Sequence, residues 1–307
     1  MPGTYPASPP TLSGDLLTVN RLLQTPAAIR RRLRTFVDLR FVSDQILTQR
    51  FTANGGAVSY EMSEPFVSDR AVTGVAPGSR YPMANLPTGT GGLASTVKWG
   101  QMVPVTDEEV KRSTYAGQVV DRNLQKVVNS VIAQVDGITM AAVASAVTTT
   151  QAASANWSAA TPTILRDILL AKAKVAKQNL GYRPNVLLVD DNHYAYMMSD
   201  TAITNALRRE ESTNPIYTGT LEIIAGLIIV VSPTSQAVNP YVIDANQLGG
   251  MADESGISPG YAVSDLAVEV KSIRQDETDS WDLQGRRLTV PVIQEPGAAC
   301  EITGSGT

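Results

Sequence analysis

The sequence has little of the chemistry on which enzymes depend. Its 307 residues include one cysteine, Cys300, and one histidine, His193. A single cysteine excludes an intrachain disulfide and a metal site built from cysteine ligands. A metal site would therefore need oxygen ligands, and no D-x-D-x-D-G spacing supports one. We expect neither a metal nor a cofactor.

Long apolar runs and a basic surplus are also missing. The longest apolar candidate, 221–231, contains Glu222 and Gly226 and is too short to span a bilayer. The first ten residues lack the basic and apolar regions of a signal peptide. A net charge of -4 excludes a globally basic nucleic-acid-binding protein. These absences favour a protein without membrane contact, made in a reducing cytoplasm.

One long amphipathic helix is the strongest positive signal. Thr106 is placed to be its N-cap, and Glu109 at the third helical position completes a capping box. Apolar residues then recur at three- and four-residue spacing: Val110, Val120, Leu124, Val127, Val128, Val131, Ile132 and Val135. The helix either ends at Gly137 or continues through the alanine-rich 141–146. Ending at Gly137 gives about 30 residues, against a mean of about 11–12 for globular proteins.

Residues 15–50 have an apolar periodicity that favours helices. Within them Arg30, Arg31, Arg32 and Arg34 form the densest positive patch of the chain. This patch is either a solvated helix face or a site of phosphate contact, which clustered arginines provide without base specificity.

Residues 51–100 have a different character. An Asn54-Gly55 turn signal between two β-prone runs predicts a hairpin. The stretch 72–94 is dense in glycine and proline and cannot form a core of its own. Such a segment favours an arm whose partner lies elsewhere. Residues 93–105 then form a returning strand that leads into the long helix.

The rest of the chain predicts an α/β region followed by β-strands. We expect helices at 162–179 and near 191–209 and strands at 186–189, 221–225, 227–231 and 241–243. Two stretches alternate with period 2 near 266–273 and 287–293, with a charged helix start or loop between them. Pro291 favours an edge position for the last strand.

Asp190, Asp191 and His193 are the only residues that suggest catalysis. A Ser-His-Asp hydrolase would have to use His193, but the sequence has no G-x-S-x-G elbow. A surface or capping role for His193, and helix capping by the two carboxylates, are the simpler interpretations. A hydrolase remains a distant alternative.

The order of these segments resembles a known family. V-K-W-G-Q-M-V-P-V-T-D-E-E-V-K-R-S (97–113), R-P-N-V-L-L-V-D-D-N-H-Y-A-Y-M (183–197) and S-D-L-A-V-E-V-K (264–271) are similar to segments of the major capsid proteins of tailed bacteriophages, which have the α+β HK97-like fold. The resemblance implies an N-terminal arm at 1–50, an extended loop at 51–100, a peripheral domain with a spine helix at 101–160, an axial domain at 161–256 and peripheral return strands at 257–307. The apolar stripe of the spine helix should pack on the strands of 263–293.

The resemblance implies a structural protein rather than an enzyme. Such subunits form the hexamers and pentamers of an icosahedral head that encloses double-stranded DNA, so the virion is the expected location after assembly in the host bacterial cytoplasm. Arg30, Arg31, Arg32 and Arg34 would then face the DNA. Arg70, Arg80, Tyr81 and Trp99 would belong to the extended loop that contacts a neighbouring subunit.

The sequence departs from the family in one respect. Some members crosslink themselves through a lysine in the extended loop and an asparagine of another subunit, but 51–97 contain no lysine and 257–307 no asparagine. We therefore expect no isopeptide bond, and a portal, a separate scaffolding protein and a decoration protein as further partners. An encapsulin-type nanocompartment shell shares the fold and is the main alternative.

Overall fold

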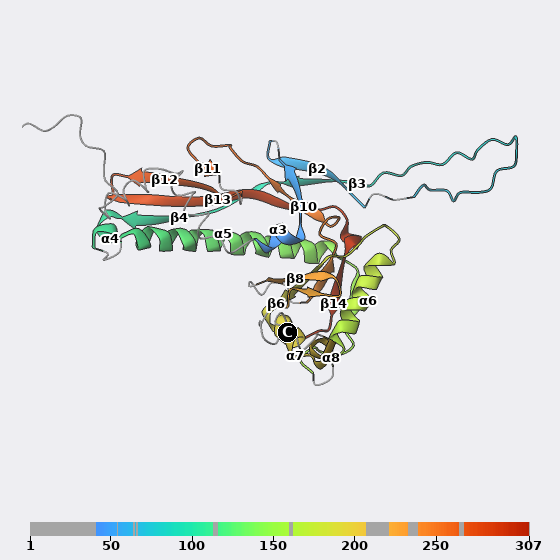
Figure 1. Ribbon diagram of the computed structural model, residues 1–307. Helices are drawn as coiled ribbons and strands as arrows, with labels where there is room; N and C mark the ends of the chain where they lie inside the picture. The colour runs from blue at the N-terminus through green and yellow to red at the C-terminus, as the bar shows by residue number, and fades with distance from the viewer. Residues whose placement is uncertain are drawn as a thin grey trace, which may run out of the picture. The chain divides into compact units, whose positions relative to one another are not determined.

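The computed structural model describes residues 41–53, 55–63, 65, 67–112, 116–159, 162–206, 221–232, 239–263 and 267–306. The chain divides into two compact units (Figure 1). The described part of unit 1 lies within 97–135 and 253–289, and unit 2 comprises 41–96, 136–252 and 290–307 with the same gaps.

Unit 1 combines a long helix with antiparallel strands. Its elements are β4 (Val97–Thr106), α4 (Asp107–Arg112), α5 (Ala116–Ala146), β11 (Ala262–Val263), β12 (Glu269–Gln275) and β13 (Ser280–Ile293), of which α5 and β13 end in unit 2. Strand β13 lies between β12 and β4, because Leu283 is in register with Ser272 on one side and Val103 on the other. β13 is therefore the central strand, flanked on both sides.

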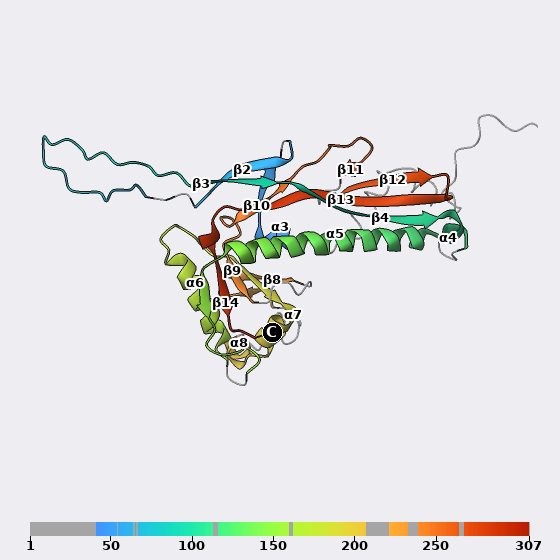
Figure 2. The same ribbon diagram turned by 180° about the vertical axis from the view of Figure 1, so that it is seen from behind.

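Helix α5 packs its apolar stripe inside the protein. All eight predicted stripe residues are buried, none more than 8% exposed. A Cβ added at Gly285 would lie 2.8 Å from Val127 Cγ1, so this glycine allows the helix to approach β13 closely. Figure 2 shows α5 running along β4 and β13. The predicted packing of the stripe on 263–293 is confirmed.

Part of helix α5 is apolar enough to resemble a membrane-spanning helix. Residues Arg122–Ala146 meet the length and composition of a membrane-spanning helix, yet half of that window is buried within the protein. The core helix of a water-soluble fold has the same composition. The helix continues to Ala146, so of the two predicted ends the later one is confirmed. Residues 113–115, between α4 and α5, lie outside the described part.

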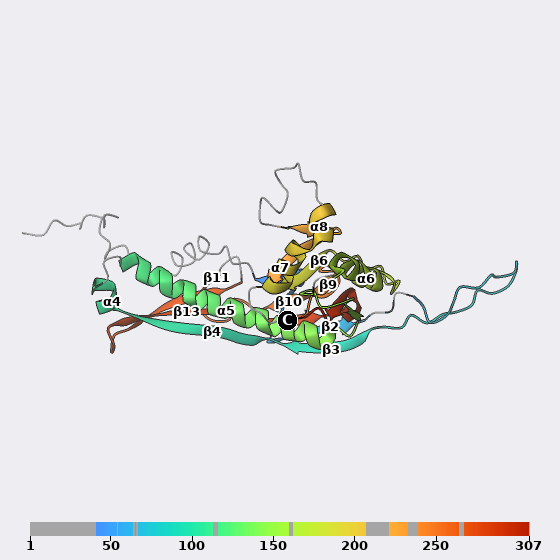
Figure 3. The ribbon, with the colours of Figure 1, turned by 90° about the horizontal axis from the view of Figure 1, so that it is seen from below.

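Unit 2 is built on a mixed sheet. Its strand order is β5 (Thr150–Ala152), β14 (Ala299–Thr303), β9 (Tyr241–Ile243), β6 (Val186–Asp190), β8 (Leu227–Ser232) and β7 (Ile223–Ile224). The pairs β5–β14 and β6–β8 are parallel and the others antiparallel. Helices α6 (Ile164–Ala176), α7 (Asp191–Ser199) and α8 (Thr201–Ala206) accompany the sheet (Figure 3). Strand β6 forms the core of this sheet, since its first four residues are all buried.

The remaining elements of unit 2 are α3 (Val42–Ile46), β1 (Gln49–Thr52), β2 (Ala57–Met62), β3 (Thr90–Ser95), β10 (Gly249–Asp253) and the 3-10 turn Pro296–Ala298. The expected hairpin at Asn54-Gly55 is wrong. Strand β1 pairs with β10, whereas β2 pairs with β3. Gly55 and Gly56 have φ of 72° and 81°, so the turn leads the chain from one sheet into another.

Two further predictions need correction, and a third is decided between its alternatives. The helix expected near 191–209 breaks at Asp200, whose extended backbone separates α7 from α8 and whose side chain accepts the Ala202 N–H. Of the two interpretations of the charged segment between β12 and β13, the loop is confirmed: the segment is the tight turn of a hairpin, with Asp279 at a φ of 46°. Pro291 lies on a central strand, but beyond the residues that pair with β4 and β12, so its missing N–H costs no bond there.

Candidate interaction surfaces

The most unusual feature of unit 2 is an arm, here defined as residues 63–89. It leaves the sheet at β2 and returns at β3, which pair from Ala57↔Ser95 to Met62↔Thr90. The described residues of the arm contain no helix or strand. Near its base Asp69 and Asn85 face each other: Asn85 N–H donates to Asp69 Oδ1 at 2.9 Å, and Asp69 N–H to Asn85 O at 3.3 Å. This contact forms a neck that closes the arm, with 70–84 as its tip.

The arm exposes apolar side chains. Each of the following is at least 77% exposed: Val67, Val72, Tyr81, Met83 and Leu86. Apolar side chains gathered on one exposed segment are typical of surfaces that another molecule covers. These exposed side chains are therefore not covered by any described residue of the chain.

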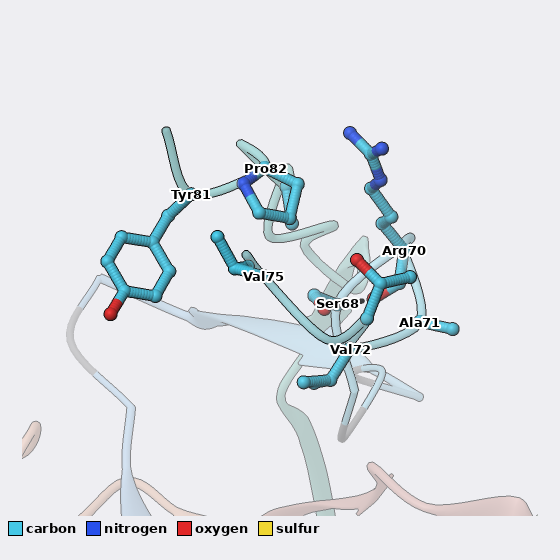
Figure 4. A pocket seen from close by; sticks show the side chains of 9 residues that line it. Ser68, Arg70, Ala71, Val72, Val75, Tyr81 and Pro82 are labelled. Atoms are coloured by element: carbon cyan, nitrogen blue, oxygen red, sulfur yellow. Dashed lines mark hydrogen bonds between the residues drawn. The ribbon is translucent and has the colours of Figure 1, made fainter. Parts of the chain in front are cut away.

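The tip also encloses a hollow of about 350 Å³, lined by residues of both limbs (Figure 4). Tyr81 and Pro82 lie on one limb, and Val72 and Val75 on the other. The guanidinium of Arg70 points away from these apolar groups. The structure thus brings Arg70 and Tyr81 to one surface.

The other predicted site residues are placed differently. Arg80 lies on the tip and is exposed, with Nη2 4.0 Å from Met83 Sδ. Trp99 lies outside the arm, half-buried in β4 and in register with Arg287 of β13. The cluster Arg30, Arg31, Arg32 and Arg34 lies outside the described residues.

The junction of β4 and α4 forms an acidic surface in unit 1. The Thr106 hydroxyl accepts the Glu109 N–H at 3.2 Å, as an N-cap does. Acidic side chains follow in the first turn of α4, and more lie in the β12–β13 turn. We call this set the acidic end; its six members, all exposed, are Asp107, Glu108, Glu109, Asp276, Glu277 and Asp279.

Arg274 joins the two halves of the acidic end. Its guanidinium lies 2.8 Å from Asp107, 3.2 Å from Asp276 and 3.6 Å from Asp279. Hydrogen bonding to Asp107 is the main cause of its raised pKa. The Asp107 N–H also donates to Asp279 O at 3.0 Å. The acidic end is therefore one contiguous surface.

Two buried ion pairs hold the sheet of unit 1 together. Arg287, fully buried, donates to both carboxylate oxygens of Asp253 at 3.0 Å. Arg286 donates to Glu269 at 2.7 Å and lies 3.7 Å from the centre of the Tyr261 ring. Sequence reasoning missed both pairs, because two adjacent arginines suggest a solvated strand. Removing one partner of such a pair leaves a buried charge and is strongly destabilising.

The suspected catalytic residues form a buried hydrogen-bonded chain in unit 2. Asp190 Oδ1 contacts His193 Nδ1, and His193 Nε2 lies 2.9 Å from Ser305 Oγ. This order of groups matches a hydrolytic triad. However, His193 and Ser305 are fully buried, so a substrate carbonyl has no path to Oγ. Asp191 is exposed and takes no part.

This chain of hydrogen bonds fixes the C-terminal segment. The ring of Trp157 packs edge-on against His193, with 5.3 Å between centroids, and the backbone N–H of Trp157 donates to the backbone carbonyl of Ser305 at 2.8 Å. Capping of α7 by Asp190 is confirmed, since its side chain accepts the His193 N–H at 2.7 Å. The expected surface position of His193 is wrong.

The single cysteine does not offer a reactive thiol at the surface. Cys300 is fully buried in β14, and burial raises the pKa of its thiol to about 11. The thiolate is therefore scarce at neutral pH, and reactivity follows the thiolate.

Comparison with known proteins connects these surfaces to a family. A family model described as phage capsid protein matches residues 89–302. No curated protein matches the chain.

Solved structures share the fold at low identity. A phage-related protein from Bordetella bronchiseptica is 12% identical, with a TM-score of 0.61 over 91% of this chain and 97% of that one. The capsid of cyanophage P-SCSP1u is 14% identical, with a TM-score of 0.61 over 87% and 89%. A virus-like particle from Pyrococcus furiosus is 12% identical, with a TM-score of 0.54 over 92% and 98%. The chain belongs to the phage capsid protein family and has the HK97-like fold.

Proposed function

We propose that this chain is the subunit of an icosahedral phage head, in which hexamers and pentamers of one protein enclose double-stranded DNA. The observation that carries this proposal is the arm, whose exposed apolar residues lack a partner among the described residues of the chain. In a shell, a neighbouring subunit supplies that partner. Residues of the tip, Arg70, Arg80 and Tyr81, would then contact the neighbour.

The division of labour along the chain follows the family. The arm and its flanking strands form the extended loop, and α5 is the spine of a peripheral domain that includes β12 and β13. The mixed sheet of unit 2, with α6 and α7, serves as the axial domain. In this arrangement α5 needs no catalytic group, because its role is to brace the subunit. The sealed Asp190–His193–Ser305 chain fits a protein without enzymatic activity.

Contact with DNA would be electrostatic and independent of base sequence. Arg30, Arg31, Arg32 and Arg34 carry it in our proposal, because clustered arginines bind phosphates in a salt-dependent manner. A portal, a separate scaffolding protein and a decoration protein are the expected further partners, and the mature shell is held together without isopeptide bonds. The virion is the site of function, after assembly in the bacterial cytoplasm.

A nanocompartment shell is the second candidate, favoured by the likeness to the Pyrococcus furiosus virus-like particle. Negative-stain microscopy of the purified chain tests both. We expect closed shells with clusters of five and six subunits; a protein that stays monomeric at high concentration would contradict either shell. Nuclease-protected DNA inside particles from infected cells supports the phage head, whereas protein cargo without DNA supports the nanocompartment.

A further inference from the structure

The tip of the arm carries charge of one sign. Arg70 and Arg80 are the only charged residues among 70–84. Both are exposed, and neither forms an ion pair within the described part of the chain. The nearest acid, Asp69, already accepts the Asn85 N–H at the neck. The tip therefore offers two guanidinium groups without an acidic partner, on a segment that also exposes apolar side chains.

The acidic end offers the opposite charge. Among the described residues, Arg274 is the cation paired with three of its six carboxylates, and Lys111 and Arg112 follow in the last turn of α4. No other stretch of the described residues gathers as many exposed carboxylates. Arg274 is occupied by Asp107, Asp276 and Asp279, whereas Glu108, Glu109 and Glu277 form no ion pair within the described part. Glu108 and Glu277 are one such free acceptor from each half of the acidic end.

We propose that the tip of one subunit docks on the acidic end of a second copy of the chain, with Arg70 and Arg80 against Glu108 and Glu277. This inference rests on the proposed shell and names the partner surface of the arm. The contact joins two different surfaces, so it is heterologous, and heterologous contacts generate closed rings where the rotation between copies closes. Rings of five and six subunits require such a contact.

Each exposed ion pair is weak, of the order of 0–1 kcal/mol. Its effect grows because every subunit in a ring makes the contact twice, once with its tip and once with its acidic end. Such pairs also fix the register and exclude wrong partners, since like charges repel. We therefore expect shell formation to weaken as salt screens the pairs.

Charge reversal with mixing tests the contact. Variant A carries Arg70→Glu and Arg80→Glu, so both its tip and its acidic end are negative. Variant B carries Glu108→Lys and Glu277→Lys, so both are positive. Each variant alone should form about tenfold fewer shells or rings than the unaltered chain, measured by sedimentation at low salt.

An equimolar mixture of A and B should recover ring formation, because each tip then meets an acidic end of opposite charge on the other variant. Alternation suits a ring of six and not a ring of five, so the mixture should favour hexamers over closed shells. Arg70→Lys with Arg80→Lys, and Glu108→Asp with Glu277→Asp, keep the charges and should assemble normally. Thermal melting of each variant checks that it is folded.

Two outcomes would overturn the inference. One is normal assembly of variant A or B; the other is loss of assembly in both without recovery on mixing. If either variant unfolds, two neutral variants are used instead. One carries Arg70→Gln and Arg80→Gln, and the other carries Glu108→Gln and Glu277→Gln. Each of these variants must then lower the salt dependence of assembly. In all these cases the shell proposal is judged separately, by whether the unaltered chain forms shells.

Discussion

Helix α5 and the arm are two long stretches of one chain with opposite relations to solvent. The seven stripe residues that lie in α5 are buried, whereas five large apolar residues of the arm are at least 77% exposed. The helix buries its residues because their spacing places them on one face. The arm is rich in glycine and proline and has no such face. The comparison separates the residues that fold the subunit from those that, in our proposal, another subunit covers.

The largest contrast should appear between two glycines of unit 2. A Cβ at Gly249 would lie 2.1 Å from the Val292 carbonyl oxygen, and its φ of +154° is unfavourable for other residues. Gly249→Ala should therefore lower the free energy of unfolding by roughly 3 kcal/mol. Gly74 of the arm has nothing within 4 Å, so Gly74→Ala should change it by less than about 0.5 kcal/mol. Denaturant unfolding measures both, and equal effects would break the comparison.

Two leucines give a difference in folding stability of comparable size. Leu124 of α5 is 2% exposed, so Leu124→Ala should cost about 2–5 kcal/mol of folding stability. Leu86 of the arm is 83% exposed, and Leu86→Ala should leave the unfolding transition unchanged while reducing the yield of shells. Chemical denaturation and sedimentation separate the two effects. A destabilised Leu86→Ala subunit would show that the arm packs on its own chain.

A smaller effect on folding stability is expected from the titration of Asp136 in α5. Asp136 is buried and accepts the N–H groups of Val42 at 3.2 Å and Ser43 at 2.9 Å. Burial raises its pKa above the ordinary value of 3.8, and the nearby Asp44 adds to the rise. Between that value and the raised pKa the folded state binds more protons than the unfolded state, so folding stability falls as pH rises through this window.

Asp136→Asn removes this titration. As pH increases from about 4, the unfolding free energy of the unaltered chain should fall relative to that of the variant. Above the raised pKa, the difference between the two should stay constant. Unfolding curves measured across this range give the slope. A difference that is independent of pH would show that Asp136 does not titrate as described.

The last prediction is that no covalent crosslink forms between subunits. Without a lysine in 51–97 the arm cannot supply the amine of an isopeptide bond. Particles boiled in detergent should release one monomer band on a denaturing gel. A ladder of covalent oligomers would refute the prediction that the arm binds its neighbour without a covalent bond.

Local patterns in the sequence predicted the parts of the fold that depend on local spacing. The stripe of α5 and the cap at Thr106 follow from residues a few positions apart, and strand 241–243 was predicted with its observed bounds. Pairing over long distances was not predictable. Strand β2 pairs with β3 across the whole arm rather than with its neighbour β1, and no local signal decides between them.

The same limit applies to the sites. Ser305 is 112 residues from His193, and a serine near the end of the chain carries no sign of that contact. Arg286 and Arg287 are buried because Glu269 and Asp253 lie opposite them on other strands. The arm was predictable as a segment without a core, since composition alone decides that. The partner surface that we propose for it was not, because that surface is assembled from α4 and a distant turn.

The central claim is that the arm makes contacts between subunits and none that its own subunit needs for folding. The neck at Asp69 and Asn85 brings the two limbs together, so residues 70–84 can be replaced by a short Gly-Gly link without moving the base. Analytical ultracentrifugation of this deletion, with its melting curve, tests the claim. The account predicts a subunit that melts like the unaltered chain and forms no shells. Shells in normal yield, or an unfolded subunit, would contradict it.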